Sequence, residues 1–195
     1  MAIKNQLLIT TLILTLAFFL PVIASAQQKV VVIPLFETVR EPIEPYSPLP
    51  DTLQTISYTT TFGEDNDYTR NPPSYSYYGD GTVTDNVTGL VWQQTDDNIQ
   101  RTWDDAWAYC QDLELPAGGW TDWRLPGANE LMSIVHYGTY NPAINSFAFP
   151  GTKSSQYWSA TTVAKTSAQA WLVGFGNGGV GRMGKSIAYY VRCVR

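Results

Sequence analysis

The residues best suited to binding chemistry are five bases near the C-terminus and three aromatic residues that lie among them in the sequence. Basic side chains form charge-assisted hydrogen bonds with sulfate and carboxylate groups. Aromatic rings suit the apolar C–H faces of sugar rings, while their polar tips stay in water. We therefore predict an anionic-glycan site that contains Lys153, Lys165, Arg182, Lys185, Arg192, Tyr157, Trp158 and Trp171. The alternative is that the bases are scattered solvated charges and that most of these aromatics belong to the core.

The formal charge of the chain is −5 at pH 7, but acids and bases are unevenly distributed along it. All seventeen acidic residues lie at or before Glu130, which gives residues 27–130 a net charge of −12. Residues 131–195 contain six bases and no acid, so their net charge is +6. The acidic total argues against a general nucleic-acid binder, whereas the basic C-terminal segment leaves room for an anionic ligand.

The composition and the remaining polar motifs do not favour catalysis. Aromatic residues make up 13% and charged residues 15% of the chain, which excludes a coiled coil or a disordered chain. The single histidine, His136, has no nucleophile motif around it, and we predict a structural or surface role. Asp104 and Asp105 could act as paired carboxylates, but their position in the first turn of a helix explains them through the helix dipole. We therefore predict that the protein is not an enzyme.

Two acidic stretches could supply oxygen ligands to calcium, namely residues 64–67 and the Asp80-Gly81 pair. The chain has no D-x-D-x-D-G loop with a glutamate downstream, which calcium-binding loops of the helix–loop–helix type require. We therefore predict no metal and no cofactor, with bound calcium as the alternative.

The N-terminus has the features of a secretory signal peptide over residues 1–26. Lys4 precedes an apolar run from Leu7 to Leu20, and Ala24-Ser25-Ala26 fits the cleavage rule of small residues. That run is too short for a membrane span, which needs about 20 apolar residues, and no second one follows. We expect an exported protein without a transmembrane segment, which is periplasmic, at the cell surface or secreted.

After the predicted cleavage site, residues 27–54 are predicted to form one short strand followed by a stiff spacer. The spacer contains four prolines within nine residues, Pro42, Pro45, Pro48 and Pro50. The folded domain is expected over residues 55–195. In an oxidising compartment its two cysteines, Cys110 and Cys193, favour a disulfide over a reactive thiol, because neither lies in a C-x-x-C motif. The disulfide would close a loop of about 84 residues and stabilise the fold by about 4.5 kcal/mol.

The periodicity of the domain predicts an α+β fold with two short helices and antiparallel β-hairpins. A helix should begin after Thr102 and bury a stripe that contains Trp103, Trp107 and Cys110; a shorter helix should follow Pro126. A hairpin is expected over residues 81–93, and further strands over 157–161, 168–175, 180–183 and 187–194. We expect Asp122 and Arg124 to form a network that orders the loop around Trp123.

Six motifs occur in an order and spacing that resemble the bacterial domain family named for the C-terminal domain of the Legionella collagen-like adhesin (Lcl). They are DGTVTDNVTGLVW, TWDDAWAYC, GGWTDWRLPGANELMSIV, YNPAIN, YWSATT and YYVRCVR. The resemblance covers residues 57–195. It implies a C-type-lectin-like α+β fold closed by one disulfide, a homotrimer, and binding of sulfated glycosaminoglycans through basic residues.

The chain departs from that adhesin in two respects. It has no Gly-X-Y collagen stalk, and it carries Gly127 where family members often have an asparagine that caps the second helix. We expect an exported, non-enzymatic adhesion or recognition domain whose partner is an extracellular glycan or polyanion, with no nucleic acid bound. The alternative is a structural or assembly module of the cell envelope that has no glycan ligand.

Overall fold

The computed structural model describes residues 49–68, 71–116 and 119–195. They all fall within residues 41–195, which form one unit by their internal contacts. The predicted signal peptide and all but the end of the predicted strand and spacer lie outside the described residues. The elements, in chain order, are η1 Asp65–Asp67, β1 Tyr75–Tyr77, β2 Thr82–Asp85, β3 Val91–Gln93, α1 Trp103–Gln111, α2 Ala128–Ser133, β4 Gln156–Thr162, β5 Gln169–Gly174 and β6 Gly179–Gly184.

The first sheet is antiparallel and has the order β1-β2-β3. The hairpin predicted over residues 81–93 is confirmed as β2 and β3, with Val83 opposite Trp92. The turn between them is organised by the carboxylate of Asp85, which accepts hydrogen bonds from the Val87 amide at 2.9 Å and from the Thr88 hydroxyl at 2.7 Å. Gly89 completes the turn with a φ of +76°, a conformation that glycine adopts without steric cost.

The second sheet is also antiparallel and has the order β4-β5-β6. The Asn177-Gly178 pair was predicted to form a hairpin, and it lies in the four-residue loop that joins β5 to β6. The register between β4 and β5 shifts between Trp158 and Thr162. All three strands and the loops between them belong to the segment after Glu130, which contains bases and no acid.

Helix α1 begins where the sequence predicts, after Thr102, whose hydroxyl accepts a hydrogen bond from the Asp105 amide at 3.4 Å. Its buried residues are Ala106 and Cys110, four positions apart and therefore on one face of the helix. Trp103 and Trp107 pack against the same hydrophobic cluster and contact each other edge to face, with ring centroids 5.8 Å apart.

Helix α2 begins after Gly127, which has no side chain to cap the helix. Two other groups take that role. The Glu130 carboxylate accepts a hydrogen bond from the Gly127 amide at 2.7 Å, and the hydroxyl of Thr161 in β4 accepts one from the Ala128 amide at 3.0 Å. The missing cap residue is therefore replaced by the helix's own glutamate and by a neighbouring strand.

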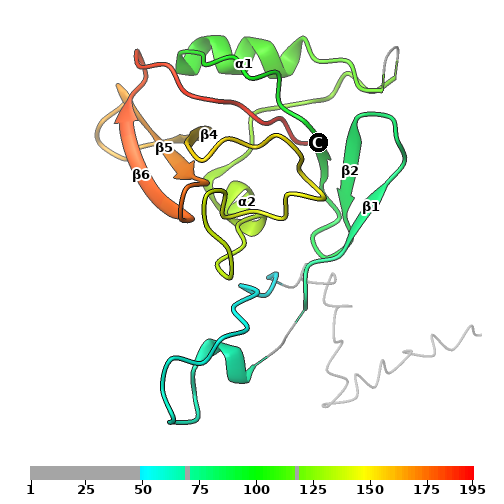
Figure 1. Ribbon diagram of the computed structural model, residues 1–195. Coiled ribbons are helices and arrows are strands. Elements are labelled where there is room, and N and C mark those ends of the chain that lie inside the picture. The colour runs from blue at the N-terminus through cyan, green and yellow to red at the C-terminus, as the bar shows by residue number, and fades with distance from the viewer. Residues whose placement is uncertain (1–48, 69–70, 117–118) are drawn as a thin grey trace, which may run out of the picture. The chain divides into compact units, whose positions relative to one another are not determined.

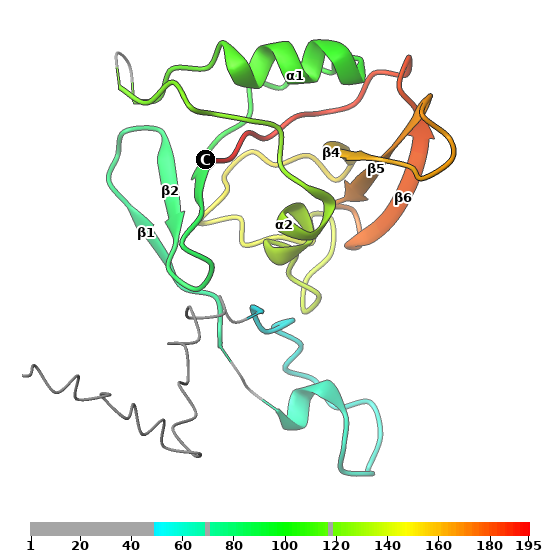
Figure 2. The ribbon, with the colours of Figure 1, turned by 180° about the vertical axis from the view of Figure 1, so that it is seen from behind.

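The strand predicted over residues 187–194 is not formed, because its residues pair singly with several different segments. Tyr189 bridges to Arg101, Tyr190 to Tyr157 in β4, and Val194 to both Trp92 in β3 and Arg124. In Figure 1 and, from behind, in Figure 2, this C-terminal segment (red) runs below α1 from β6 towards the first sheet. The segment therefore forms single bridges to a strand of each sheet and does not add a strand to either one.

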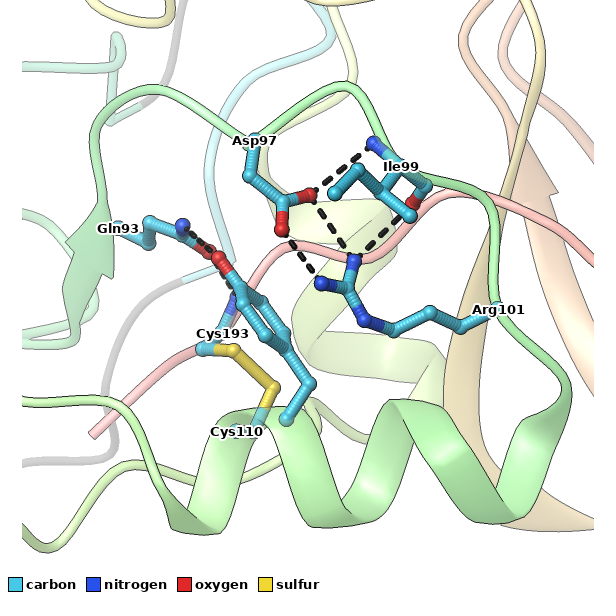
Figure 3. The surroundings of a disulfide bond; sticks show 7 residues. Gln93, Asp97, Ile99, Arg101, Cys110 and Cys193 are labelled. Atoms are coloured by element: carbon cyan, nitrogen blue, oxygen red, sulfur yellow. Dashed lines mark hydrogen bonds and ion pairs between the residues drawn. A yellow bond between two sulfur atoms is a disulfide. The ribbon is translucent and has the colours of Figure 1, made fainter.

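The predicted disulfide is confirmed and fixes α1 to the C-terminal segment (Figure 3). The sulfur atoms of Cys110 and Cys193 are 2.01 Å apart, and both residues are fully buried. Beside the disulfide, the Gln93 side chain donates to the Tyr109 hydroxyl and accepts from the Cys193 amide. The structure is therefore α+β, with two helices, two antiparallel sheets and one disulfide, as predicted.

Candidate functional site

Eight cationic side chains lie in the described part of the chain, and their partners divide them into two sets of four. Each cation of the first set has a carboxylate oxygen within 4.0 Å, in the pairs Arg101–Asp97, Arg124–Glu130, Arg192–Asp96 and Arg195–Asp122. The second set has no carboxylate of the described residues within that distance, and we call its members the unpaired cations: Lys153, Lys165, Arg182 and Lys185.

The unpaired cations all lie on the second sheet or in its loops. Lys165 is in the loop between β4 and β5, and Lys185 follows β6 at the same end, where its amide donates to the Ala168 carbonyl at 2.9 Å. Arg182 lies within β6, which is one of the two edge strands of this sheet. Lys153 precedes β4 and lies towards the opposite end of the sheet, where β4 pairs with the last residue of β5.

Lys185 is held in place by neutral groups. Its Nζ lies 3.6 Å from the ring centroid of Trp103 and donates a hydrogen bond to the Thr162 hydroxyl at 2.9 Å. The Trp103 indole is itself fixed, because its Nε1–H donates to the Ser159 carbonyl at 2.8 Å. A cation above an aromatic ring gains about 0.5–1 kcal/mol at an exposed site and keeps its charge uncompensated. The ammonium group therefore retains donors for an external anion.

Arg182 lies directly opposite Trp171 in the β5–β6 ladder. Directly opposed residues of an antiparallel pair project to the same side of the sheet, so this cation and this ring are neighbours. Trp171 is half-buried and Arg182 is exposed. Of the three aromatics predicted to contact ligand, Trp171 is the one that has access to solvent.

Arg192 was predicted to bind ligand, and the structure corrects this because its side chain is fully buried. Its guanidinium donates to the Gln93 carbonyl and to the Thr152 hydroxyl, both at 2.8 Å, and its Nη2 lies 3.4 Å from the Asp96 carboxylate. Burial lowers the pKa of Arg192, but a guanidinium stays charged throughout the physiological range. Arg192 is therefore a structural residue of the interior. Among the described residues its Nε has no hydrogen-bond partner, whereas its other two nitrogens do.

The predicted ligand contacts of Tyr157 and Trp158 are also wrong, because both side chains are fully buried. The Tyr157 hydroxyl donates to the Asp96 carboxylate at 2.6 Å, and burial raises the pKa of this phenol. The Trp158 indole donates to the Arg101 carbonyl at 3.0 Å. Adjacent strand residues face opposite sides of a sheet, and here each side is covered by a hydrophobic cluster.

The loop around Trp123 is ordered, although not by the predicted Asp122–Arg124 network. Asp122 accepts two hydrogen bonds from Arg195, and Arg124 donates two to Glu130, at 2.7 and 2.6 Å. Each of the two side chains therefore ties the loop to a different segment, Asp122 to the C-terminal residue and Arg124 to helix α2. Trp123 itself is buried, and its indole donates to the carbonyls of Leu115 and Trp120.

The acidic stretches considered for calcium are used in local turns. The Asp67 carboxylate accepts hydrogen bonds from the amides of Gly63 and Glu64, and Asp80 accepts from the amide and hydroxyl of Thr82. The residues that the structure describes include no group of three or more His, Cys, Asp or Glu side chains placed to hold a metal ion.

The sequence did not reveal which residues contact the predicted basic side chains. Asp96 and Gln93 hold the buried Arg192, yet neither belongs to a motif that would reveal this, since they are about 100 positions away in sequence. The contact between Lys185 and the Trp103 ring was equally hidden, because helix α1 and this end of the second sheet meet only in the folded chain. The absence of acids after Glu130 was the one visible sign that bases in this segment would remain unpaired.

These observations define an α+β domain that one disulfide closes and that carries the four unpaired cations on one sheet and its loops. The family model of the Lcl C-terminal domain matches residues 81–195, which is more than half of the chain. The chain therefore belongs to the Lcl C-terminal domain family. The match includes β2–β6, both helices and both cysteines, and it begins later than the predicted residue 57. No curated protein matches the chain.

Proposed function

We propose that the protein is an exported, non-enzymatic recognition domain that binds an extracellular polyanionic glycan, with sulfated glycosaminoglycans as the first candidates. One observation carries the proposal: the four unpaired cations share the second sheet and its loops, in a chain whose net charge is negative. The acidic residues that the structure describes supply partners for four other cations but for none of these.

The arrangement suits a ligand with several separated anionic groups. Lys165 and Lys185 lie at one end of the sheet, Arg182 lies along its edge strand, and Lys153 lies towards the other end. A linear polymer with sulfate or carboxylate groups along its length can contact dispersed cations, whereas a single small anion cannot. Trp171, beside Arg182, offers an apolar surface for a sugar ring between anionic groups.

We propose as well that the protein has no catalytic activity and that it is exported. The disulfide leaves no free cysteine among the described residues, which argues against catalysis by a reactive thiol. A disulfide of this kind persists in an oxidising compartment and so supports export. Among the described residues there is no helix with the length and apolar character that a membrane crossing requires. A C-type-lectin-like arrangement of the elements is part of the proposal as well.

A glycan array that includes heparin, heparan sulfate, chondroitin sulfate and neutral glycans tests the proposal. The purified protein should bind the sulfated members, and binding should weaken with added salt, because the Debye length falls to about 10 Å at 0.1 M. The variant with Lys153, Lys165, Arg182 and Lys185 all replaced by glutamine should lose the signal. No binding of any sulfated glycan at low salt would contradict the proposal and leave the structural envelope module as the alternative.

A homotrimer would multiply this surface, since avidity raises apparent affinity without new contacts. Sedimentation of the purified protein measures the oligomeric state directly. A trimer would bind an immobilised polyanion more tightly than a short soluble fragment, whereas a monomer would show no such difference.

A further inference from the structure

The loop between α2 and β4, yellow-green to yellow in Figure 1, contains residues that line a pocket away from the unpaired cations. Residues 136–146 of this loop line an open pocket of about 430 Å³. This volume falls within the range of small-molecule sites, about 300–1,000 Å³. None of the unpaired cations lines the pocket, so it is separate from the proposed polyanion surface.

The backbone of this loop is fixed at several points. The His136 amide donates to the Ala143 carbonyl at 3.1 Å, which closes the loop on itself. The Asn141 amide donates to the Gly176 carbonyl at 2.9 Å, and the Ala143 amide donates to the Phe175 carbonyl at 2.6 Å, so the loop is also tied to the loop between β5 and β6. A pocket with a backbone fixed in this way is already formed before a ligand binds, which reduces the entropy cost of binding.

Hydrogen bonds within the loop orient the polar side chains of the pocket but leave some of their donors without a partner among the described residues. Oδ1 of Asn145 accepts hydrogen bonds from the amides of Phe147 and Ala148, at 3.0 and 3.1 Å, so its Nδ2 carries the free donors. Nδ1 of His136 accepts from the Gly138 amide at 3.1 Å, which leaves Nε2–H as a donor. Within the described part of the chain, neither donor has a hydrogen-bond partner.

The pocket carries no formal charge near neutral pH. Burial lowers the pKa of His136 below its usual 6.5, which favours the neutral imidazole, and no acid or other base lines the pocket. A ligand that depends on ion pairing therefore gains little here. Ligands with several hydroxyl groups, which both donate and accept hydrogen bonds, match the free donors of the pocket.

Tyr140 supplies an aromatic surface at the rim. Its side chain is 79% exposed, the joint highest value among the large hydrophobic residues of the described chain. Its hydroxyl and that of Ser146, which also lines the pocket, have no partner among the described residues. An exposed ring beside several free hydrogen-bonding groups is suited to a sugar, which presents an apolar C–H face and polar edges.

From this geometry we infer that the His136–Ser146 pocket is a binding site for one uncharged sugar ring, stacked on Tyr140 and held by hydrogen bonds from Asn145 and His136. The inference does not rest on the polyanion surface. A chain that binds no sulfated glycan would still bind a neutral sugar in this pocket. The two sites also differ in their response to salt, because an uncharged ligand is not screened.

Amide chemical-shift mapping by NMR on the ¹⁵N-labelled full-length protein tests the site. The probes are the methyl glycosides of glucose, galactose, mannose and N-acetylglucosamine, each added to millimolar concentration. At least one glycoside should shift the amides of residues 136–146 in a saturable manner, equally at low and high salt. Heparin fragments should leave these amides unchanged.

Two variants with matched controls establish which groups bind. Tyr140→Ala should weaken binding by about five- to tenfold, through loss of the stacking surface. Tyr78→Ala, which removes a tyrosine that is 71% exposed outside the pocket, should leave binding unchanged. Asn145→Asp keeps the oxygen that accepts from Phe147 and Ala148 and removes the free donors, so the fold should persist while binding weakens.

Three results would overturn the inference. They are the absence of saturable shifts with all four glycosides, shifts that map outside residues 136–146, and binding that is the same in the Tyr140→Ala and Tyr78→Ala variants. Because Asn145→Asp retains the acceptor of the local turn, an unchanged affinity in a folded Asn145→Asp variant would remove Asn145 from the site.

Discussion

The two sheets differ in how they use charge. Near the first sheet, carboxylates are buried and bonded within the protein: Asp85 organises the β2–β3 turn, and Asp96 contacts Arg192 and Tyr157. The second sheet and its loops contain no acid, and their four cations have no carboxylate partner in the part of the chain that the structure describes. Internal pairing thus joins the C-terminal segment to the rest of the fold, whereas the charges of the second sheet remain available to a ligand.

This difference separates structural cations from binding cations. A buried cation must be paired and hydrogen-bonded, because an isolated charge in the interior costs several kcal/mol. An exposed cation without a partner costs little in water, so its position on the surface is free to serve binding. The comparison therefore predicts large stability effects for paired cations and large binding effects for unpaired ones.

The largest stability effect is expected for Arg192→Met. This change leaves Asp96 buried without its cation and removes the hydrogen bonds to Gln93 and Thr152, which should lower the free energy of unfolding by about 3–5 kcal/mol. Urea denaturation measures it, with Arg182→Met as the control. The control replaces an exposed arginine and should cost less than about 0.5 kcal/mol. Equal losses in the two variants would remove the distinction between the sets.

A smaller loss is expected for Glu130→Gln, because its pair with Arg124 is half-exposed. We expect a decrease of about 1 kcal/mol at neutral pH. Hydrogen bonding to Arg124 holds the pKa of Glu130 below its ordinary value of 4.5, so this stability is present above pH 4.5 and is lost as the pH falls through the lowered pKa. Thermal unfolding of both proteins should show a difference that shrinks towards acidic pH. A difference that is constant with pH would contradict the ion pair.

A comparable or smaller loss is expected for Thr161→Val, which removes the hydroxyl that accepts from the Ala128 amide at the start of α2. Loss of a cap costs about 0.5–1 kcal/mol. Thr166→Val, in the exposed loop between β4 and β5, is the control for the change of residue type. Equal stability of the Thr161→Val variant and the native protein in urea would show that Glu130 alone caps this helix.

The smallest stability effects are expected for single glutamine replacements of the unpaired cations, each within about 0.5 kcal/mol. Lys185→Gln should lie at the upper end, because it loses the contact with Trp103. The four urea midpoints should agree closely with that of the native protein. A loss of more than about 2 kcal/mol in any of them would reveal a structural role and so contradict the division into two sets.

Much of this fold could be predicted from the sequence because its determinants are local. Thr102 marks the start of α1, Asn177-Gly178 marks a hairpin loop, and two cysteines have one way to pair. The segment 187–194 was mispredicted because its alternating residues resemble a strand, while its partners lie in four separate segments. Periodicity reports that a segment is extended and does not report what it pairs with.

The site was harder to predict because burial and pairing are decided by distant residues. Lys185 and Arg192 are both bases of the acid-free segment, and only the folded chain shows that Trp103 lies beside one and Asp96 beside the other. Tyr157 and Trp158 likewise look suited to sugar stacking, but both faces of β4 are covered at their positions. The uneven distribution of acids and bases along the sequence was informative, because bases in an acid-free segment can form ion pairs only with acids from elsewhere in the chain.

The most direct test of the account is the affinity for a heparin oligosaccharide of two double variants with equal loss of charge. One variant is Lys165→Gln with Lys185→Gln, from the unpaired set; the other is Arg101→Gln with Arg195→Gln, from the paired set. Titration calorimetry at low salt should show about tenfold weaker binding for the first variant and little change for the second. Equal weakening of both would show that net charge alone attracts the ligand, which would contradict a binding surface on the second sheet.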